Sequence, residues 1–194
     1  MDTTQIVMIA IASVVVLILI VWFFSTWNRF VNLEENAQQA WSNIDVLLQQ
    51  RYDMIPNLVN IVKGYAEHES SIFDQFAQAR QTAAGALAQG DVKGVAAAEG
   101  ILAGMLPRIN MVAEQYPDLK ANQNIMQVQE ELVSTENKVA FSRQAYNDSV
   151  MQYNTYRESF PQVVIAGPMR FGPAELLEST ESAEERQAPK VSFQ

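Results

Sequence analysis

The sequence predicts an all-α protein in which an N-terminal transmembrane helix continues into an antiparallel up-and-down bundle of about four long helices. Two observations lead to this prediction. Residues 6–24 hold 18 hydrophobic residues in 19, and the rest of the 194-residue chain repeats its apolar residues at helical spacings. We divide the chain into a short N-terminus (1–5), an anchor (6–28), a helical bundle (29–172) and an acidic, flexible tail (173–194).

The apolar run is long enough to cross a bilayer once, since 19 residues of helix span about 28 Å. A cleaved signal peptide is the competing interpretation, and it requires a basic start and small residues after the apolar stretch. This chain instead has Asp2 before the run and Trp22 and Trp27 at its end. We therefore expect an uncleaved, single-pass anchor, with the lipid bilayer as a partner. Arg29 favours a cytoplasmic bundle.

One buried helical face is predicted directly after the anchor. Its apolar positions recur at steps of three or four: Phe30, Leu33, Ala37, Trp41, Ile44, Leu48, Tyr52 and Ile55. Pro56 cannot donate to the helical ladder, so we expect a kink or a short break between Met54 and Asn57. The pattern resumes at Leu58 and continues as far as Phe76.

Two connectors separate the following helices. Gly85 to Gly90 is rich in small residues and reads as a linker, with Asp91 as the N-cap of an alanine-rich helix that Pro107 bends. Residues 116–122 (YPDLKAN) form the next turn, in which Asn122 can cap the last long helix.

The last helix has a strict seven-residue apolar repeat at Ile125, Leu132, Val139, Tyr146, Tyr153 and Phe160, which predicts about 36 helical residues. Glu136, Arg143, Asn147 and Asn154 flank this seam. Buried polar groups need partners, so we favour a structural polar network that fixes helix register, and keep a ligand or partner site as the alternative. Residues 163–165, enclosed by Pro and Gly, predict an irregular or extended strap, and the acidic residues from Glu175 onward predict the flexible tail.

These segments carry a family pattern. Residues 40–69, with PNLV, and residues 114–161, with YPDLKAN, TEN, YN and FP, closely resemble the two hallmark regions of the LemA family of bacterial membrane proteins. The resemblance covers Phe30 to about Phe171. It implies one N-terminal helix in a bacterial inner membrane, followed by a bundle of mostly four long antiparallel helices, and it implies no enzymatic activity.

Few residues are suited to catalysis. The chain has no cysteine, and His68 is its only histidine. A Glu67-His68-Glu69 sequence cannot direct three ligands to one ion from a regular helix, and no zinc, phosphate-loop or nucleophile-elbow motif accompanies it. We expect no enzyme, no cofactor and no metal. The net charge of -9 also argues against nucleic-acid binding.

The aromatic residues Trp41, Tyr52, Tyr65 and Phe73 are candidates either for the core or for an interface between copies. The leading hypothesis is a non-enzymatic, membrane-anchored scaffold that self-associates as a homo-oligomer and organises the membrane or other membrane proteins. A signalling adaptor or sensor is the alternative, with the polar network as its coupling element. A metal-dependent enzyme using His68 is a weaker alternative.

Overall fold

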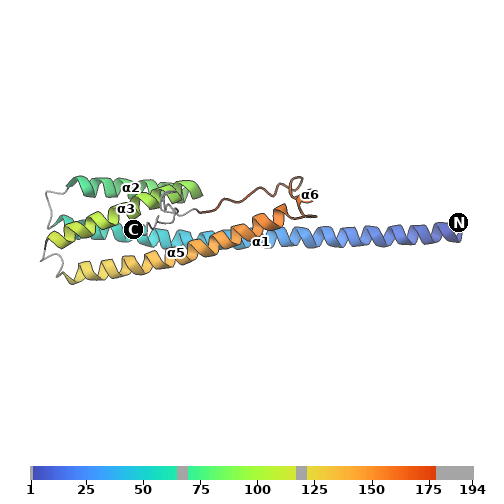
Figure 1. Cartoon of the computed structure of the whole chain (residues 1–194), viewed down its shortest axis with the longest axis horizontal. Coiled ribbons are helices and arrows are strands. Elements are labelled where there is room, and N and C mark those ends of the chain that lie inside the picture. The colour runs from blue at the N-terminus through green and yellow to red at the C-terminus, as the bar shows by residue number, and fades with distance from the viewer. Residues whose placement is uncertain (1, 65–69, 117–121, 178–194) are drawn as a thin grey trace, which may run out of the picture. The chain divides into compact units, whose positions relative to one another are not determined.

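The computed structural model describes residues 2–64, 70–116 and 122–177, and within these ranges every regular element is a helix. The helices are α1 (Thr3–Lys63), α2 (Ser70–Ala88), α3 (Val92–Gln115), α5 (Gln123–Glu158) and the short α6 (Val163–Ala166). Figure 1 shows their arrangement. The all-α prediction is confirmed, and α5 has the predicted 36 residues.

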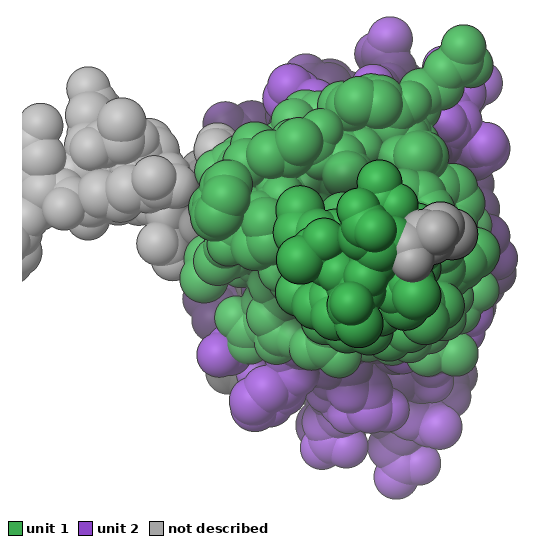
Figure 2. Space-filling view, turned by 90° about the vertical axis from the view of Figure 1, so that its right-hand side faces the viewer, with its two compact units in different colours: residues 1–40, 148–174 green, residues 41–147, 175–194 purple. Residues whose placement is uncertain are grey.

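The chain forms two compact units, coloured separately in Figure 2. Unit 1 comprises residues 1–40 and 148–174, and unit 2 comprises residues 41–147 and 175–194. The core of unit 1 contains Phe30 and Leu33 from α1, Tyr153 from α5 and Ala166 from α6. Phe30 stacks on Phe171 with ring centroids 4.5 Å apart and planes 10° apart.

Unit 2 has a core of aliphatic and phenylalanine side chains from four helices, all of them less than 3% exposed. They are Ile44, Leu48, Ile55, Leu58, Val62, Phe73, Phe76, Ala83, Val95, Ala98, Leu102, Ile125 and Val139. The seven-residue seam of α5 is buried at five of its six predicted positions. The exception is Phe160, which lies beyond the end of α5 and is 83% exposed.

Helix α1 passes through Pro56 without the break predicted near it, and ends at Lys63 instead. A proline at this position leaves the carbonyl four residues earlier, that of Tyr52, without its helical donor. The Nε of Arg80 on α2 donates to this carbonyl at 2.6 Å. A side chain from the neighbouring helix therefore replaces the missing backbone hydrogen bond.

The connector between α2 and α3 is shorter than predicted, because α2 includes Gly85 and ends at Ala88. Gly90 has a φ of 65°, a conformation that glycine adopts without strain. Asp91 caps α3 as expected, its carboxylate accepting from the backbone N–H of Gly94 at 3.0 Å. Asn122 likewise accepts from the N–H of Asn124 at 2.9 Å at the start of α5.

The segment after α5 differs from its prediction in two ways. Residues 163–166 form the helical turn α6 instead of an extended strap. The extended part comes later, at residues 171–177, and includes the first five residues of the predicted tail. Leu177, in that tail, is only 1% exposed. Residues 178–194 lie outside the described residues, and so does the prediction that they are flexible.

Candidate functional site

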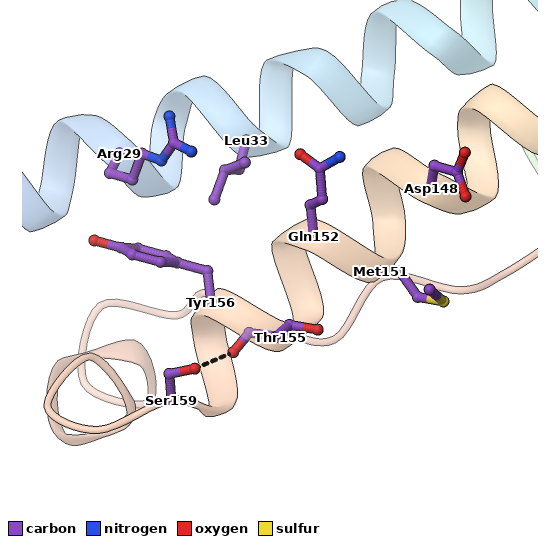
Figure 3. A pocket seen from close by; sticks show the side chains of 8 residues that line it. All are labelled: Arg29, Leu33, Asp148, Met151, Gln152, Thr155, Tyr156 and Ser159. Carbon is purple, nitrogen blue, oxygen red and sulfur yellow. Dashed lines mark hydrogen bonds between the residues drawn. The ribbon is translucent and has the colours of Figure 1, made fainter.

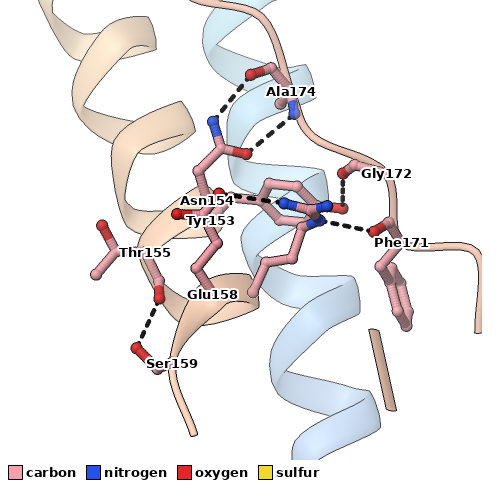
Figure 4. Close-up of polar contacts among 9 residues, drawn as sticks. Tyr153, Asn154, Thr155, Glu158, Ser159, Phe171, Gly172 and Ala174 are labelled. Carbon is pink, nitrogen blue, oxygen red and sulfur yellow. Dashed lines mark hydrogen bonds and ion pairs between the residues drawn. The ribbon is translucent and has the colours of Figure 1, made fainter. Parts of the chain in front are cut away.

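A Tyr-Asn pair on α5 binds the extended segment in unit 1 (Figure 4). The Tyr153 hydroxyl donates to the carbonyl of Gly172 at 2.8 Å. The Asn154 side chain bonds both backbone groups of Ala174: its Nδ2 donates to the carbonyl at 2.9 Å, and its Oδ1 accepts from the N–H at 3.0 Å. An amide side chain has the donor and acceptor of a peptide group, so Asn154 pairs with Ala174 as a neighbouring strand would.

The same pair recurs seven residues earlier on α5, within unit 2. The Tyr146 hydroxyl donates to the carbonyl of Glu175 at 2.8 Å. Asn147 bonds the carbonyl of Leu177 at 3.0 Å and its N–H at 2.9 Å. We call these two arrangements the Tyr-Asn clamps.

The spacing of the Tyr-Asn clamps follows from backbone geometry. Their members are seven residues apart on α5, and the residues they bind are three apart in the extended segment. Seven residues of helix rise about 10.5 Å, and three residues of extended chain cover about 10 Å. The two repeats therefore match in length, which lets the same residue pair be used twice.

Burial raises the pKa of both clamp tyrosines. For Tyr146 the second cause is the Glu175 carboxylate. For Tyr153 it is the Glu34 carboxylate. Both phenols therefore keep the proton that they donate to the extended segment.

The four residues of the predicted polar network do not share one environment. Asn147 and Asn154 bind the backbone of the extended segment, as described above. Glu136 is exposed, and Arg143 is half-buried with an Nε that meets no hydrogen-bond partner in the part of the chain the structure describes. The structure brings none of the four into a hydrogen bond with another, within the described residues. The repeat of Tyr-Asn at a spacing of seven was the sequence signal that could have pointed to the clamps.

A buried ionic cluster lies in unit 2 and was not predicted. Arg51 on α1 and Glu99 on α3 form an ion pair at 2.6 Å, with side chains only 5% and 3% exposed. The second oxygen of Glu99, the Nη2 of Arg51 and the hydroxyl of Tyr52 are buried and without a hydrogen-bond partner among the described residues. Burial, and next the Glu99 carboxylate, raises the pKa of Tyr52 far above its ordinary value. Periodicity could not reveal the ion pair, because Arg51 and Glu99 are charged residues on different helices, 48 residues apart in the sequence.

Two of the four residues proposed for either the core or an interface are buried. Tyr52 and Phe73 are each 2% exposed, which favours the core for these two. Trp41 is half-buried against Tyr146, with ring centroids 5.4 Å apart. Tyr65 lies outside the described residues.

A shallow groove of about 490 Å³ runs between α1 and α5 in unit 1 (Figure 3). It is lined by Arg29, Leu33, Asp148, Met151, Gln152, Thr155, Tyr156 and Ser159. A second hollow, of about 600 Å³, lies along α5 in unit 2. None of the four predicted network residues lines either of these two. The described residues contain no group of three potential metal ligands, and His68 lies outside them.

The anchor region has the exposure expected of a lipid-facing helix. Among the described residues, α1 is the one helix long and apolar enough to cross a membrane, and its large apolar side chains between Ile6 and Val21 are 45–69% exposed. Together with the helical units, this defines the chain as a membrane-associated helical protein.

The chain belongs to the LemA family, whose family model matches residues 40–193. The match extends through the acidic tail, beyond the end of the resemblance at Phe171. Two relatives are named magnetosome proteins. MamQ of Magnetospirillum gryphiswaldense is 26% identical over 177 residues, covering 79% of this chain and 65% of the relative. MamQ 2 of Paramagnetospirillum magneticum is 27% identical over 175 residues, covering 78% and 64%. The chain thus spans slightly less than two thirds of each relative's length.

Proposed function

We propose that this protein is a non-enzymatic, membrane-anchored helical scaffold that self-associates and organises the membrane or holds partner proteins at it. Membership of the LemA family and the similarity to magnetosome proteins support a membrane-associated role. Neither description names a catalytic activity. Inner-membrane location and a cytoplasmic orientation of the bundle are part of the proposal.

The observation that carries self-association is an exposed apolar face on α5 in unit 2. Met126 is 47%, Val133 59% and Phe141 75% exposed. Met126 and Val133 are seven residues apart, so they lie on one side of the helix, about a third of a turn from the buried seam, and Phe141 lies about 80° further around the helix from Val133. Met126 and Val133 also line the hollow of about 600 Å³ on this helix. Large apolar side chains aligned on a surface are typical of protein interfaces.

Because each copy is anchored in the membrane, a small contact surface is enough for self-association. Chains held in one membrane meet at a much higher effective concentration than the same chains free in solution. An interface built on three apolar side chains can then assemble copies without a large buried area. Assembly through the helical units is also favoured because Ala10, Ala12 and Ser13 do not form a close-packing dimer motif in the anchor.

The test is the native mass of the full-length protein extracted in a mild detergent. We expect an oligomer for the natural sequence and a shift towards monomer for a Val133→Ser, Phe141→Ser double variant. Val46→Ser is the matched control, since Val46 is 65% exposed on α1. A strict monomer in every detergent and in cross-linked membranes contradicts the proposal.

A signalling adaptor is the second candidate, because the Tyr-Asn clamps hold Ala174 and Leu177, at the start of the acidic tail. Release of the clamps would change how the tail is presented to a partner. A pulldown with the full-length protein tests this function. An Asn147→Leu, Asn154→Leu variant that remains folded and yet recovers the same partners, in the same amounts, contradicts it.

A further inference from the structure

The corner that follows α5 is fixed to α1 where the apolar run ends. We define the α6 corner as residues 160–171. Ala166 of α6 is 3% exposed in the unit 1 core beside Phe30, and Phe171 meets the ring of Trp27 edge-on at 5.4 Å. Trp27 comes three residues after the apolar run, a rise of about 4.5 Å. The α6 corner is therefore held at the level where α1 leaves the hydrocarbon.

Side chains of α1 in this short stretch are less exposed than those in the apolar run before it. Thr26 is 3% exposed, and Trp22 and Phe23 are half-buried, in contrast to the exposed residues before them. Figure 1 shows α6 alongside this part of α1, beyond the end of α5. Residues of the α6 corner thus lie beside α1 at the level where an interfacial aromatic belt is expected.

The α6 corner turns large apolar side chains away from the protein. Phe160 is 83%, Val164 62% and Val163 48% exposed, while Ala166 on the same turn faces the core. Exposure of these three apolar side chains to water is energetically unfavourable. Transfer into the adjacent membrane boundary would remove their apolar surface from water.

The charge of the α6 corner also suits a membrane surface. From Ser159 to Phe171 the only charged residue is Arg170, although the whole chain has a net charge of -9. Arg170 is exposed, and so is Arg29 on α1. A segment with arginine and no carboxylate is attracted to anionic headgroups, whereas most of this acidic chain is repelled by them.

We propose that the α6 corner is a second membrane contact, in which Phe160, Val163 and Val164 enter the headgroup–acyl boundary of the leaflet that α1 crosses on leaving the bilayer. The occupant is lipid because the α6 corner contacts α1 at Trp27, three residues past the end of the apolar run. One helix alone can rotate about its axis in the bilayer. A second attachment on one side of α1 fixes that rotation.

The absence of cysteine allows a direct test in the full-length chain. Phe160→Cys and Val164→Cys are labelled with an environment-sensitive NBD fluorophore and reconstituted into vesicles of phosphatidylcholine and phosphatidylglycerol. Val14→Cys, inside the apolar run, is the lipid control. Val46→Cys is the aqueous control, being 65% exposed on α1 within unit 2. We expect blue-shifted emission at 160 and 164, quenching by nitroxide lipids, and protection from iodide, as at position 14.

Each other outcome overturns the proposal in a distinguishable way. If position 14 is quenched by lipid but 160 and 164 behave like 46, the second contact is absent while the anchor stands. If 160 and 164 are protected from iodide yet not quenched by lipid, protein covers the corner. If position 14 itself is not quenched by lipid, the anchor and the second contact fail together, whereas the native-mass test of self-association is unaffected.

Discussion

Individual side chains in this protein replace backbone interactions. Asn147 and Asn154 each bond the N–H and carbonyl of one residue in the extended segment, and Arg80 bonds a carbonyl that a proline leaves unpaired. The sequence pattern identified the two asparagines as polar residues beside the buried seam, but it did not predict that they bind the backbone of Ala174 and Leu177. An extended segment of mixed composition has no periodicity that would pair it with a helix.

Asn154→Ala removes both hydrogen bonds to Ala174 and leaves its N–H and carbonyl without that partner. We expect a loss of about 1–3 kcal/mol in the free energy of unfolding. Urea denaturation followed by circular dichroism measures it. Gln144→Ala, an exposed position on the same helix, is the control and should change stability little. Equal stability for the two variants would show that the clamp contributes nothing.

Glu99→Gln leaves the Arg51 guanidinium buried without its counter-charge. Breaking a buried pair in this way costs about 3–5 kcal/mol. The matched control is Glu158→Gln, which alters an ion pair whose carboxylate side chain is 70% exposed and should cost less than about 1 kcal/mol. An Arg51→Met, Glu99→Leu double variant should recover most of the loss. Comparable denaturation midpoints for Glu99→Gln and Glu158→Gln would contradict the role of the pair.

Alkaline pH should weaken unit 2 through Tyr52. Its pKa is raised in the folded protein, whereas an unfolded tyrosine ionises near pH 10. Above about pH 10 the unfolded chain binds fewer protons than the folded one, so this contribution to stability falls as pH rises. Tyr52→Phe should reduce the decline measured by urea denaturation between pH 8 and 11. An unchanged slope in the variant rules Tyr52 out as a cause.

At the scale of the helices, periodicity predicted most of what the structure contains. The repeat in α5 gave its length and five buried seam positions, and the caps at Asp91 and Asn122 followed from residue type. The errors concern Gly and Pro. Gly85 stays within α2 and Pro56 within α1, because tertiary contacts such as that of Arg80 outweigh the local preference to stop a helix.

Pro56 and Arg80 should be energetically coupled. In the natural sequence, Arg80→Met leaves the Tyr52 carbonyl unpaired and should cost about 1–3 kcal/mol. In a Pro56→Ala background the backbone N–H of residue 56 can bond that carbonyl, so the same change should cost clearly less. A double-mutant cycle by urea denaturation measures the difference. Asp53→Ala controls for the exposed Arg80–Asp53 ion pair, and additive effects of the two changes would disprove the coupling.

At the scale of the whole molecule, hydrophobic residues serve two environments. The apolar run of α1 is exposed, which suits lipid, while the remaining apolar residues fill the cores of the two units. Composition predicted this division. It could not predict the Arg51–Glu99 pair or the position of α6, because both depend on which residues distant in sequence become neighbours.

Two charges placed in the run should release the protein from the membrane. Val14→Arg with Leu17→Arg costs about 5–7 kcal/mol on the insertion scale, against the roughly 4–8 kcal/mol that the Leu, Ile, Val and Phe residues of the run supply. We expect the double variant to be extracted from membranes by alkaline carbonate. Val46→Arg with Phe141→Arg, exposed positions outside the run, should stay in the membrane fraction. Retention of both variants would mean that the run is not what anchors the chain.

The equal lengths of the two clamp repeats also restrict how this part of the chain can evolve. If one residue were added or deleted between Gly172 and Leu177, the backbone groups after that point would no longer lie opposite the asparagine side chain that binds them. A change of length is tolerated only as a paired event, in which three residues gained by the extended segment accompany seven gained by α5. Homologues of different size should therefore carry one, two or three Tyr-Asn pairs, with matching numbers of three-residue steps in the segment that follows.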